Sequence, residues 1–245
     1  MHCKRILVLA LLALPAARAD AADITVMCPP PMRAVMTDLV AAFEHASGRK
    51  VTIVFAPSTA IITRVGGGEP VDIAILTAPA ADALIKAGKL ARRVDLAKST
   101  IGVAVRHGAP RPDIGSAAAF RRTLLAAKSF ARNEGAESGT YMKGLIERLG
   151  VAEQMRPKTT LVPSGYVAEL VARGEVELGA QQVSELMSVA GVDITPLPVE
   201  LQHVMIFSAG IAATPASPAA VDALLEFLTA PTAAPVIRAK GLDPA

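Results

Sequence analysis

The stretch VDIAIL at residues 71–76, followed by PAADALIKAG at residues 79–88, contains the strand-to-helix unit on which the fold is built. The first part is a short run of apolar and β-branched residues, typical of a buried strand. In the second part apolar residues recur at helical spacing, with Pro79 near the start and Gly88 after the end. A strand that leads into a helix of this length predicts a βαβ unit and therefore an α/β domain.

The same alternation continues on both sides of this unit. Further strands are predicted at residues 23–28, 50–56, 100–105, 128–131, 159–162, 178–182 and 203–213. Helices are predicted at residues 32–48, 58–65, 117–127, 138–149, 165–173, 218–229 and 231–239. No Pro/Gly-rich linker divides the chain, so we predict an α/β protein of two lobes joined by strands, with a mostly parallel sheet in each lobe.

The N-terminus predicts export. Lys4 and Arg5 precede an apolar run at residues 6–14, and small residues follow it at the spacing of a cleavage site. This is the pattern of a secretory signal peptide, and the run is shorter than the roughly 20 residues of a membrane span. We expect a signal peptide at residues 1–21, cleaved after Ala19 or Ala21, and a periplasmic mature protein.

Composition excludes several classes of function. Aromatic residues make up 3% of the chain, too few for the stacking platforms that bind single-stranded nucleic acid. The formal net charge of +3 is modest and no basic run is present, so no nucleic-acid partner is expected. Once the signal peptide is removed, Cys28 is the one remaining cysteine and no Cys/His metal set is present. We predict no metal and no cofactor.

Three predicted strand-to-helix junctions are candidate anion sites, because free N–H groups and the helix dipole attract anions to a helix N-terminus. They are CPPPMR at residues 28–33, FAPST at residues 55–59 and ARNEGAESGTY at residues 131–141. Ser58 and Ser138 occupy positions where a serine often caps a helix, and a lone Arg33 is often a surface residue. The same serine can cap the helix in the free protein and still bind a ligand through its N–H or hydroxyl.

Nothing in the sequence is built for catalysis. A nucleophilic Cys28 requires a base, and His45, His107 and His203 are far apart along the chain. The nucleophile-elbow, Walker and dinucleotide motifs are absent. We therefore predict that the protein is not an enzyme, and rank an exported enzyme that uses Cys28 last.

Ordered short motifs along the chain resemble the periplasmic molybdate-binding protein family, a branch of the type II solute-binding proteins of ABC importers. The motifs are ITV at 24–26, FAPST at 55–59, GEPVDIAIL at 68–76, SGTYMK at 138–143, RGEVELG at 173–179 and FLTAPTAAPVI at 227–237. The resemblance implies the type II periplasmic-binding-protein fold, with a ligand cleft between the lobes. We expect one lobe at residues 22–101 plus 206–245 and the other at residues 102–205.

The resemblance also implies a set of ligand groups. The family's second serine falls on Ser58, its third-loop donor on Ser138, and its fourth-loop donor near Ser164 or Gly165. Its first serine falls on Pro31 and its tyrosine on Gln182, so two expected donors are lost or altered. The predicted ligand residues are Pro31, Met32, Arg33, Ser58, Thr59, Ser138, Gly139, Ser164, Gly165 and Gln182.

Arg33 follows two residues after the lost serine and suggests a changed ligand. A guanidinium binds a planar carboxylate through two hydrogen bonds, so we favour an organic carboxylate over molybdate or tungstate. Gln181 and Gln182, with Tyr141 or Tyr166, would bind further polar groups. The alternative is that the prolines only shape the loop and the backbone N–H groups of Met32 and Arg33 bind an oxyanion.

The function that we predict is anion capture for an inner-membrane ABC permease, by a monomer that closes like a hinge on its ligand. A sensory ligand-binding module is the second reading, and the sequence does not separate the two.

Overall fold

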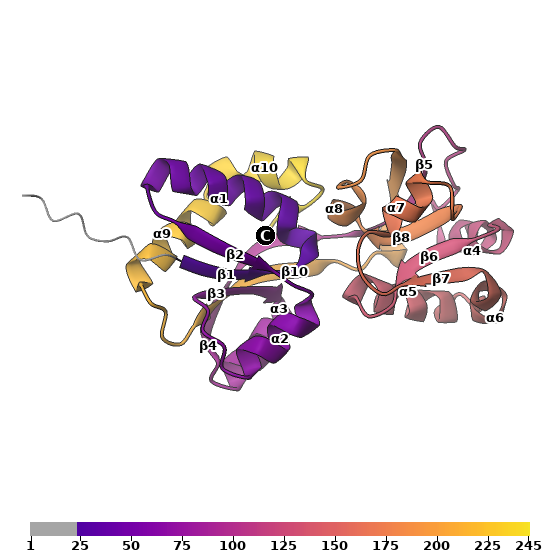
Figure 1. The fold of residues 1–245 in the computed structure, drawn as a ribbon. Helices are drawn as coiled ribbons and strands as arrows, with labels where there is room; N and C mark the ends of the chain where they lie inside the picture. The colour runs from indigo at the N-terminus through magenta and orange to yellow at the C-terminus, as the bar shows by residue number, and fades with distance from the viewer. Residues whose placement is uncertain (1–23) are drawn as a thin grey trace, which may run out of the picture.

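The computed structural model describes residues 24–245, and within them the chain forms two α/β lobes (Figure 1). Each lobe has one sheet with helices on both faces, and two chain segments connect the lobes. The predicted two-lobed α/β fold is confirmed. The predicted signal peptide at residues 1–21 lies outside the described residues.

The sheet of the first lobe has six strands in the order β11-β4-β10-β3-β1-β2. β1 runs parallel to β2 and β3, whereas β10 and β4 are antiparallel to their neighbours. The strands are β1 (Ile24–Cys28), β2 (Val51–Phe55), β3 (Ile73–Thr77), β4 (Leu90–Ser99), β10 (Met205–Ala212) and β11 (Asp243–Pro244).

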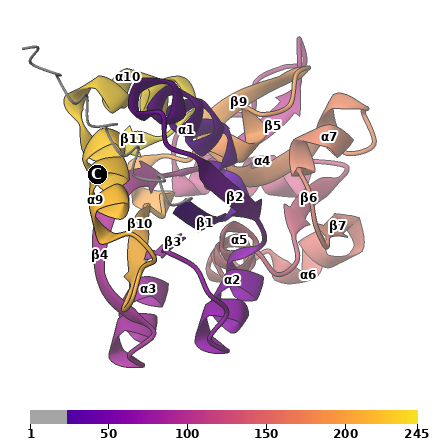
Figure 2. The same ribbon diagram turned by 60° about the vertical axis from the view of Figure 1, so that its left-hand side comes forward.

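Alternate residues along these strands pack on opposite sides, as the period of a strand requires. Val26 and Cys28 face the helices α1, α9 and α10, while Met27 faces α2 and α3. Figure 2 shows α2 and α3 on one side of the sheet and α1 and α10 on the other. The helices are α1 (Arg33–Ser47), α2 (Ser58–Gly66), α3 (Ala78–Lys86), α9 (Pro218–Thr229) and α10 (Ala234–Ala239), with short 3₁₀ turns η1 (Pro30–Met32) and η4 (Pro231–Ala233).

The sheet of the second lobe has five strands in the order β7-β6-β8-β5-β9. Helices α4, α5 and α6 cover one face, and α7 and α8 cover the other. The strands are β5 (Ile101–Arg106), β6 (Phe130–Asn133), β7 (Thr159–Val162), β8 (Leu178–Gln182) and β9 (Val192–Pro196). The helices are α4 (Ala117–Ala126), α5 (Glu137–Arg148), α6 (Ala152–Met155), α7 (Val167–Ala172) and α8 (Val183–Leu186), with 3₁₀ turns η2 (Arg156–Lys158) and η3 (Val199–Leu201).

Both sheets are mixed rather than mostly parallel. The antiparallel strands β4, β9 and β11 were not predicted, and β5 and β10 also pair antiparallel. β4 carries Arg92, Arg93 and Asp95, which hide its strand pattern in the sequence. Arg92 pairs with Asp222 of α9, and Arg93 with Asp82 of α3 and Asp95, so the charges are satisfied by tertiary contacts.

Asp72, within the GEPVDIAIL motif, has a structural role. The Asp72 side chain is buried, and its two carboxylate oxygens accept the backbone N–H groups of Thr25 at 2.8 Å and Ala216 at 2.7 Å. It therefore ties the start of β1 to the segment between β10 and α9.

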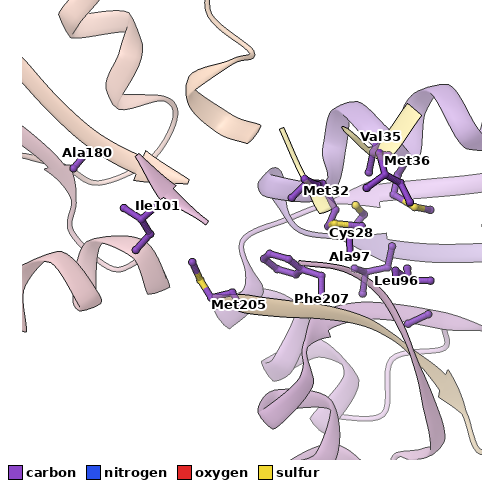
Figure 3. Packing of buried hydrophobic residues seen from close by; sticks show 14 of the residues in the cluster. Cys28, Met32, Val35, Met36, Leu96, Ala97, Ile101, Ala180, Met205 and Phe207 are labelled. Carbon is purple, nitrogen blue, oxygen red and sulfur yellow. The ribbon is translucent and has the colours of Figure 1, made fainter. Parts of the chain in front are cut away.

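Two crossing segments join the lobes and lie side by side. β4 passes into β5 through Thr100, and the chain returns from β9 to β10 through residues 197–204. Gln202 links the two segments: its Oε1 accepts the Ile101 N–H at 2.7 Å, and its Nε2 donates to the carbonyls of Ile101 and Leu197. Figure 3 shows Met205 between Ile101 and Phe207, so the buried cluster is continuous from one lobe to the other.

Within the described part of the chain, no single helix has the length and hydropathy of a membrane span. The pair Pro218–Thr229 and Pro231–Ala239, bent by 55°, passes that test only when both are counted together.

Candidate functional site

The first loop presents an arginine side chain and has no free backbone donors at Met32 and Arg33. The Met32 N–H donates to the Pro29 carbonyl at 3.0 Å, and the Arg33 N–H donates to the Pro30 carbonyl. The Met32 side chain is buried in the core. The expectation that these two N–H groups bind an oxyanion is therefore wrong, because the 3₁₀ turn uses both.

The Arg33 side chain is exposed and lies 3.9 Å from the centroid of the Phe55 ring. It forms no ion pair with any carboxylate of residues 24–245. Stacking on an aromatic face orients a guanidinium and leaves its N–H donors available. Because Cys28 and Phe55 are direct partners in the β1–β2 pair, the sheet brings the first and second loops together.

In the second loop, Ser58 is the first residue of α2 and not its cap. Pro57 is the N-cap, with an extended backbone (φ −56°, ψ 146°), and no side chain makes a capping hydrogen bond. The proline ring fixes the φ value with which a helix can begin, so it displaces the serine by one position. The Ser58 hydroxyl is half-buried, and Thr59 is exposed beside it.

The third loop follows β6 and leads into α5. Ala136 is the N-cap of α5, so the prediction that Ser138 caps this helix is wrong. Ser138 lies in the first turn, is 1% exposed, and its Oγ has no hydrogen-bond partner. The structure explains why residue 139 is a glycine: a Cβ at this position would lie 2.1 Å from the Asn133 carbonyl oxygen. The glycine thus allows the helix backbone to pack on the end of β6.

The fourth loop places Ser164 and Gly165 on the surface, and Gly165 adopts φ +89°. The Gly165 carbonyl accepts hydrogen bonds from Asn133 Nδ2 at 3.2 Å and Gln181 Nε2 at 3.3 Å. Gln181 Oε1 accepts the Val167 N–H at the start of α7, at 2.8 Å. Gln181 therefore holds the loop in place, and its binding of a ligand stays a prediction.

Gln182 ends β8 and is the N-cap residue of α8. Its side chain is 3% exposed; Nε2 contacts Met205 Sδ of the first lobe at 3.0 Å, and Oε1 has no partner. Ser184, two residues further on, is also buried with an unpaired Oγ. α8 packs against η1 of the first lobe, so these groups lie near the first loop.

Buried polar atoms without partners lie at the ends of β4, β6 and β8 and in the first turns of α5 and α8. In residues 24–245 they are Ser99 Oγ, Asn133 Oδ1, Ser138 Oγ, Gln182 Oε1 and Ser184 Oγ. β6 and β8 are adjacent parallel strands, so their carboxyl ends meet at one edge of the sheet. Leaving such an atom unpaired costs about 1–3 kcal/mol, and proteins rarely retain several in one place without a role. The cluster indicates a ligand site.

Sequence reasoning missed three members of this cluster, Ser99, Asn133 and Ser184. Asn133 and Ser99 are the last residues of β6 and β4. Asn133 lies just after the predicted strand at residues 128–131, and a polar residue at that place is a signal that could have identified it. Ser99 could not have been identified in this way, because β4 was not predicted as a strand. Ser184 carries no such signal, because its burial depends on packing between the lobes.

Burial raises the pKa of three acidic groups near these loops. The Cys28 thiol is fully buried and its pKa is raised strongly, with Arg33 acting weakly in the opposite direction. A thiolate is therefore disfavoured and Cys28 is no nucleophile. Burial raises the pKa of Glu185 in α8 to about 8, against hydrogen bonds from the Gln181 side chain and the Gln182 backbone. Burial also raises the pKa of Glu137, and His203 lowers it.

Residues 24–243 match the sequence model of a family described as bacterial extracellular solute-binding protein. The chain belongs to this family. The chain is 36% identical over 230 residues to an aconitate isomerase of a Pseudomonas species, covering 90% of the chain and 87% of that protein. It is 26% identical over 207 residues to the molybdate-binding protein ModA of Rhodobacter capsulatus, covering 83% and 81% respectively. The periplasmic molybdate-binding protein of Azotobacter vinelandii shares the fold, with a TM-score of 0.73 at 16% identity over 89% of this chain and 98% of that one.

Family membership confirms the resemblance to the molybdate-binding branch of solute-binding proteins, and with it an extracellular place of action and an association with ABC importers. The prediction that the protein is not an enzyme is wrong. A relative of 36% identity over nearly the whole chain is named as an isomerase, so this family's fold supports catalysis. The motif search recognises nucleophiles, metals and cofactors, so it does not detect a reaction that proceeds by proton transfer alone.

Proposed function

We propose that the protein binds an aconitate-like unsaturated tricarboxylate between its lobes and interconverts its cis and trans isomers. The observation that carries the proposal is the 36% identity to aconitate isomerase over 90% of the chain. The unpaired serine hydroxyls of the cluster and the exposed Arg33 guanidinium support it, because a tricarboxylate needs several donors of different kinds.

The ligand groups divide between the lobes. Arg33 would bind one carboxylate through two N–H groups, with the Ser58 hydroxyl beside it in the adjacent loop. The first-turn N–H groups of α5 and the Ser138 hydroxyl would bind a second carboxylate. One N–H of Gln182 Nε2 points to Met205 Sδ at 3.0 Å, and the second N–H of the amide would donate to the ligand. A ligand with carboxylates on both lobes would favour their closed arrangement.

The reaction itself is a proton transfer. Aconitate has a methylene carbon next to a carbon–carbon double bond, and a base can remove one methylene proton. The electron pair delocalises over the allylic carbons and the carboxylates. Returning the proton to the other allylic carbon moves the double bond by one position and allows either geometry. The proton is returned at the end, so no other reactant is consumed.

Solute capture for an ABC permease is the second candidate, and the family match over residues 24–243 favours it. Under this proposal a monomeric, exported protein, with its signal peptide at residues 1–21 removed, delivers the carboxylate without binding nucleic acid. Molybdate is disfavoured as the ligand, because Pro31 and Gln182 stand where the resemblance predicts a serine and a tyrosine.

Proton NMR of the purified protein with cis-aconitate, and separately with trans-aconitate, tests the proposal. We expect each isomer to give the same final mixture, at a rate proportional to protein concentration. Tight binding of aconitate without interconversion would favour capture alone, and neither binding nor interconversion would refute both candidates. Heat-denatured protein is the control for spontaneous isomerisation.

A further inference from the structure

One side of α5 faces the segment that returns from the second lobe to the first. The Tyr141 ring stacks on the His203 ring with centroids 4.6 Å apart and planes 11° from parallel. The Tyr141 hydroxyl donates to the Leu201 carbonyl at 2.8 Å, and Arg148 lies over the Tyr141 ring at 5.2 Å. These contacts hold the side chain of His203 against the helix at the boundary between the lobes.

Glu137 lies on the same side of α5. It is the first residue of the helix, four positions before Tyr141, and residues four apart are neighbours on a helix surface. Its side chain is open to solvent, and the next residue, Ser138, carries one of the unpaired buried hydroxyls. Glu137 therefore lies next to one of the proposed ligand groups, on the side of α5 that carries Tyr141 with His203 stacked on it.

The surroundings of Glu137 are unusual for a carboxylate at a helix N-terminus. That position normally favours the ionised form. Here partial desolvation raises the pKa of the Glu137 carboxyl, while the charge of His203 acts in the opposite direction, and the residue stays exposed to solvent. A carboxylate whose basicity is raised and that remains accessible is suited to accept a proton from a substrate.

We propose that Glu137 is the general base that moves the allylic proton; this inference rests on the proposed isomerase function. The Glu137 carboxylate takes a proton from the methylene carbon, breaking the C–H bond and leaving the electron pair in the allylic carboxylate system. The same carboxyl then returns its proton to the other allylic carbon. Glu137 ends as a carboxylate, and no other reactant is consumed.

Glu185 and Cys28 are two other groups near these loops whose pKa is raised by burial, and both fit this role less well. Glu185 is 5% exposed and its carboxyl is held by Gln181 and by the backbone of its own helix. This is the arrangement of a capping box, in which a glutamate bonds back to the N-cap N–H. Cys28 is fully buried. Glu137 is the one of the three that a substrate can reach.

The test compares Glu137→Gln, Glu137→Asp and the control Glu134→Gln, which changes an exposed glutamate in the same loop. We expect Glu137→Gln to lower the turnover of aconitate by about a hundredfold or more, the usual contribution of a general base. Glu137→Asp, which keeps the carboxylate but withdraws it, should retain more activity than the glutamine variant. Glu134→Gln should remain within twofold of the wild type.

Thermal shifts with trans-aconitate separate catalysis from binding and folding. Glu137→Gln should melt like the wild type without ligand and still be stabilised by the ligand. Retention of more than a third of the wild-type turnover would overturn the role of Glu137 alone. Loss of turnover together with loss of the ligand shift would also overturn it, because Glu137 would then act in binding. A wild type that does not isomerise aconitate would remove the proposed function and this inference together.

Discussion

Replacing the Ser138 hydroxyl should stabilise the free protein and weaken ligand binding at the same time. Ser138 is 1% exposed, and its Oγ has no partner in the described structure. Ser138→Ala removes a buried group whose desolvation costs about 1–3 kcal/mol and leaves a cavity close to zero. For a protein of this size, 1 kcal/mol corresponds to about 2–4 °C in the melting temperature.

The same change should cost affinity. A hydrogen bond to a charged group contributes about 1.5–3 kcal/mol, so we expect Kd for trans-aconitate to rise about tenfold to a hundredfold. Urea unfolding without ligand and isothermal titration calorimetry with ligand give the two quantities separately. Opposite signs for stability and affinity are what distinguish a ligand-binding serine from a structural one.

Ser116 provides the matched control. Its Oγ accepts the Ala119 N–H at 3.1 Å and caps α4. Ser116→Ala should therefore lose about 1 kcal/mol of stability and leave Kd unchanged. If Ser138→Ala destabilised the protein as Ser116→Ala does, with no change in affinity, the interpretation of the polar cluster as a ligand site would be wrong.

Three further predictions concern stability. Lys158 Nζ donates to three carbonyls at the end of α4, at 2.7–2.9 Å, so Lys158→Met should lower the free energy of unfolding in urea by about 2–3 kcal/mol; a loss below 0.5 kcal/mol would contradict this. The pKa of Glu185 is about 8 in the fold and about 4.3 unfolded, so stability should fall as pH rises from about 5 to 8, by up to about 1.4 kcal/mol per unit. Below pH 4 this loss is absent, and Glu185→Gln should remove the slope; equal slopes in the two proteins would refute the assignment. Gly139→Ala, whose Cβ would lie 2.1 Å from a backbone oxygen, should cost about 1–3 kcal/mol and also weaken aconitate binding, whereas an unchanged melting temperature would show that α5 can shift freely.

The alternation of strands and helices was readable because its signals are local. VDIAIL forms β3 and the following segment forms α3, with Pro79 near the start of the helix as predicted. β4, β9 and β11 escaped because their stability comes from partners elsewhere in the chain. β4 is stabilised as a strand by pairing with β10 and by ion pairs to α3 and α9. These partners are distant in sequence, so the pattern of neighbouring residues does not indicate them.

The loops were located correctly, but the roles of their residues were not all foreseeable. Which residue caps a helix differs by one or two positions from the predicted Ser58 and Ser138, because neighbouring residues also start helices. Gln181 is satisfied by Val167 and Gly165, whereas the adjacent Gln182 retains an unpaired oxygen. The sequence contains no difference between the two glutamines that would assign these roles; the pleat of β8 does so.

The central claim is that the unpaired polar cluster and Arg33 form a site for an organic polycarboxylate. Isothermal titration calorimetry of the wild type with trans-aconitate and with molybdate, under identical conditions, tests it most directly. The account predicts saturable binding of trans-aconitate that Arg33→Ala weakens at least tenfold, and no heat of binding with molybdate. Tight binding of molybdate with none of aconitate would contradict the account and assign the site to a tetrahedral oxyanion.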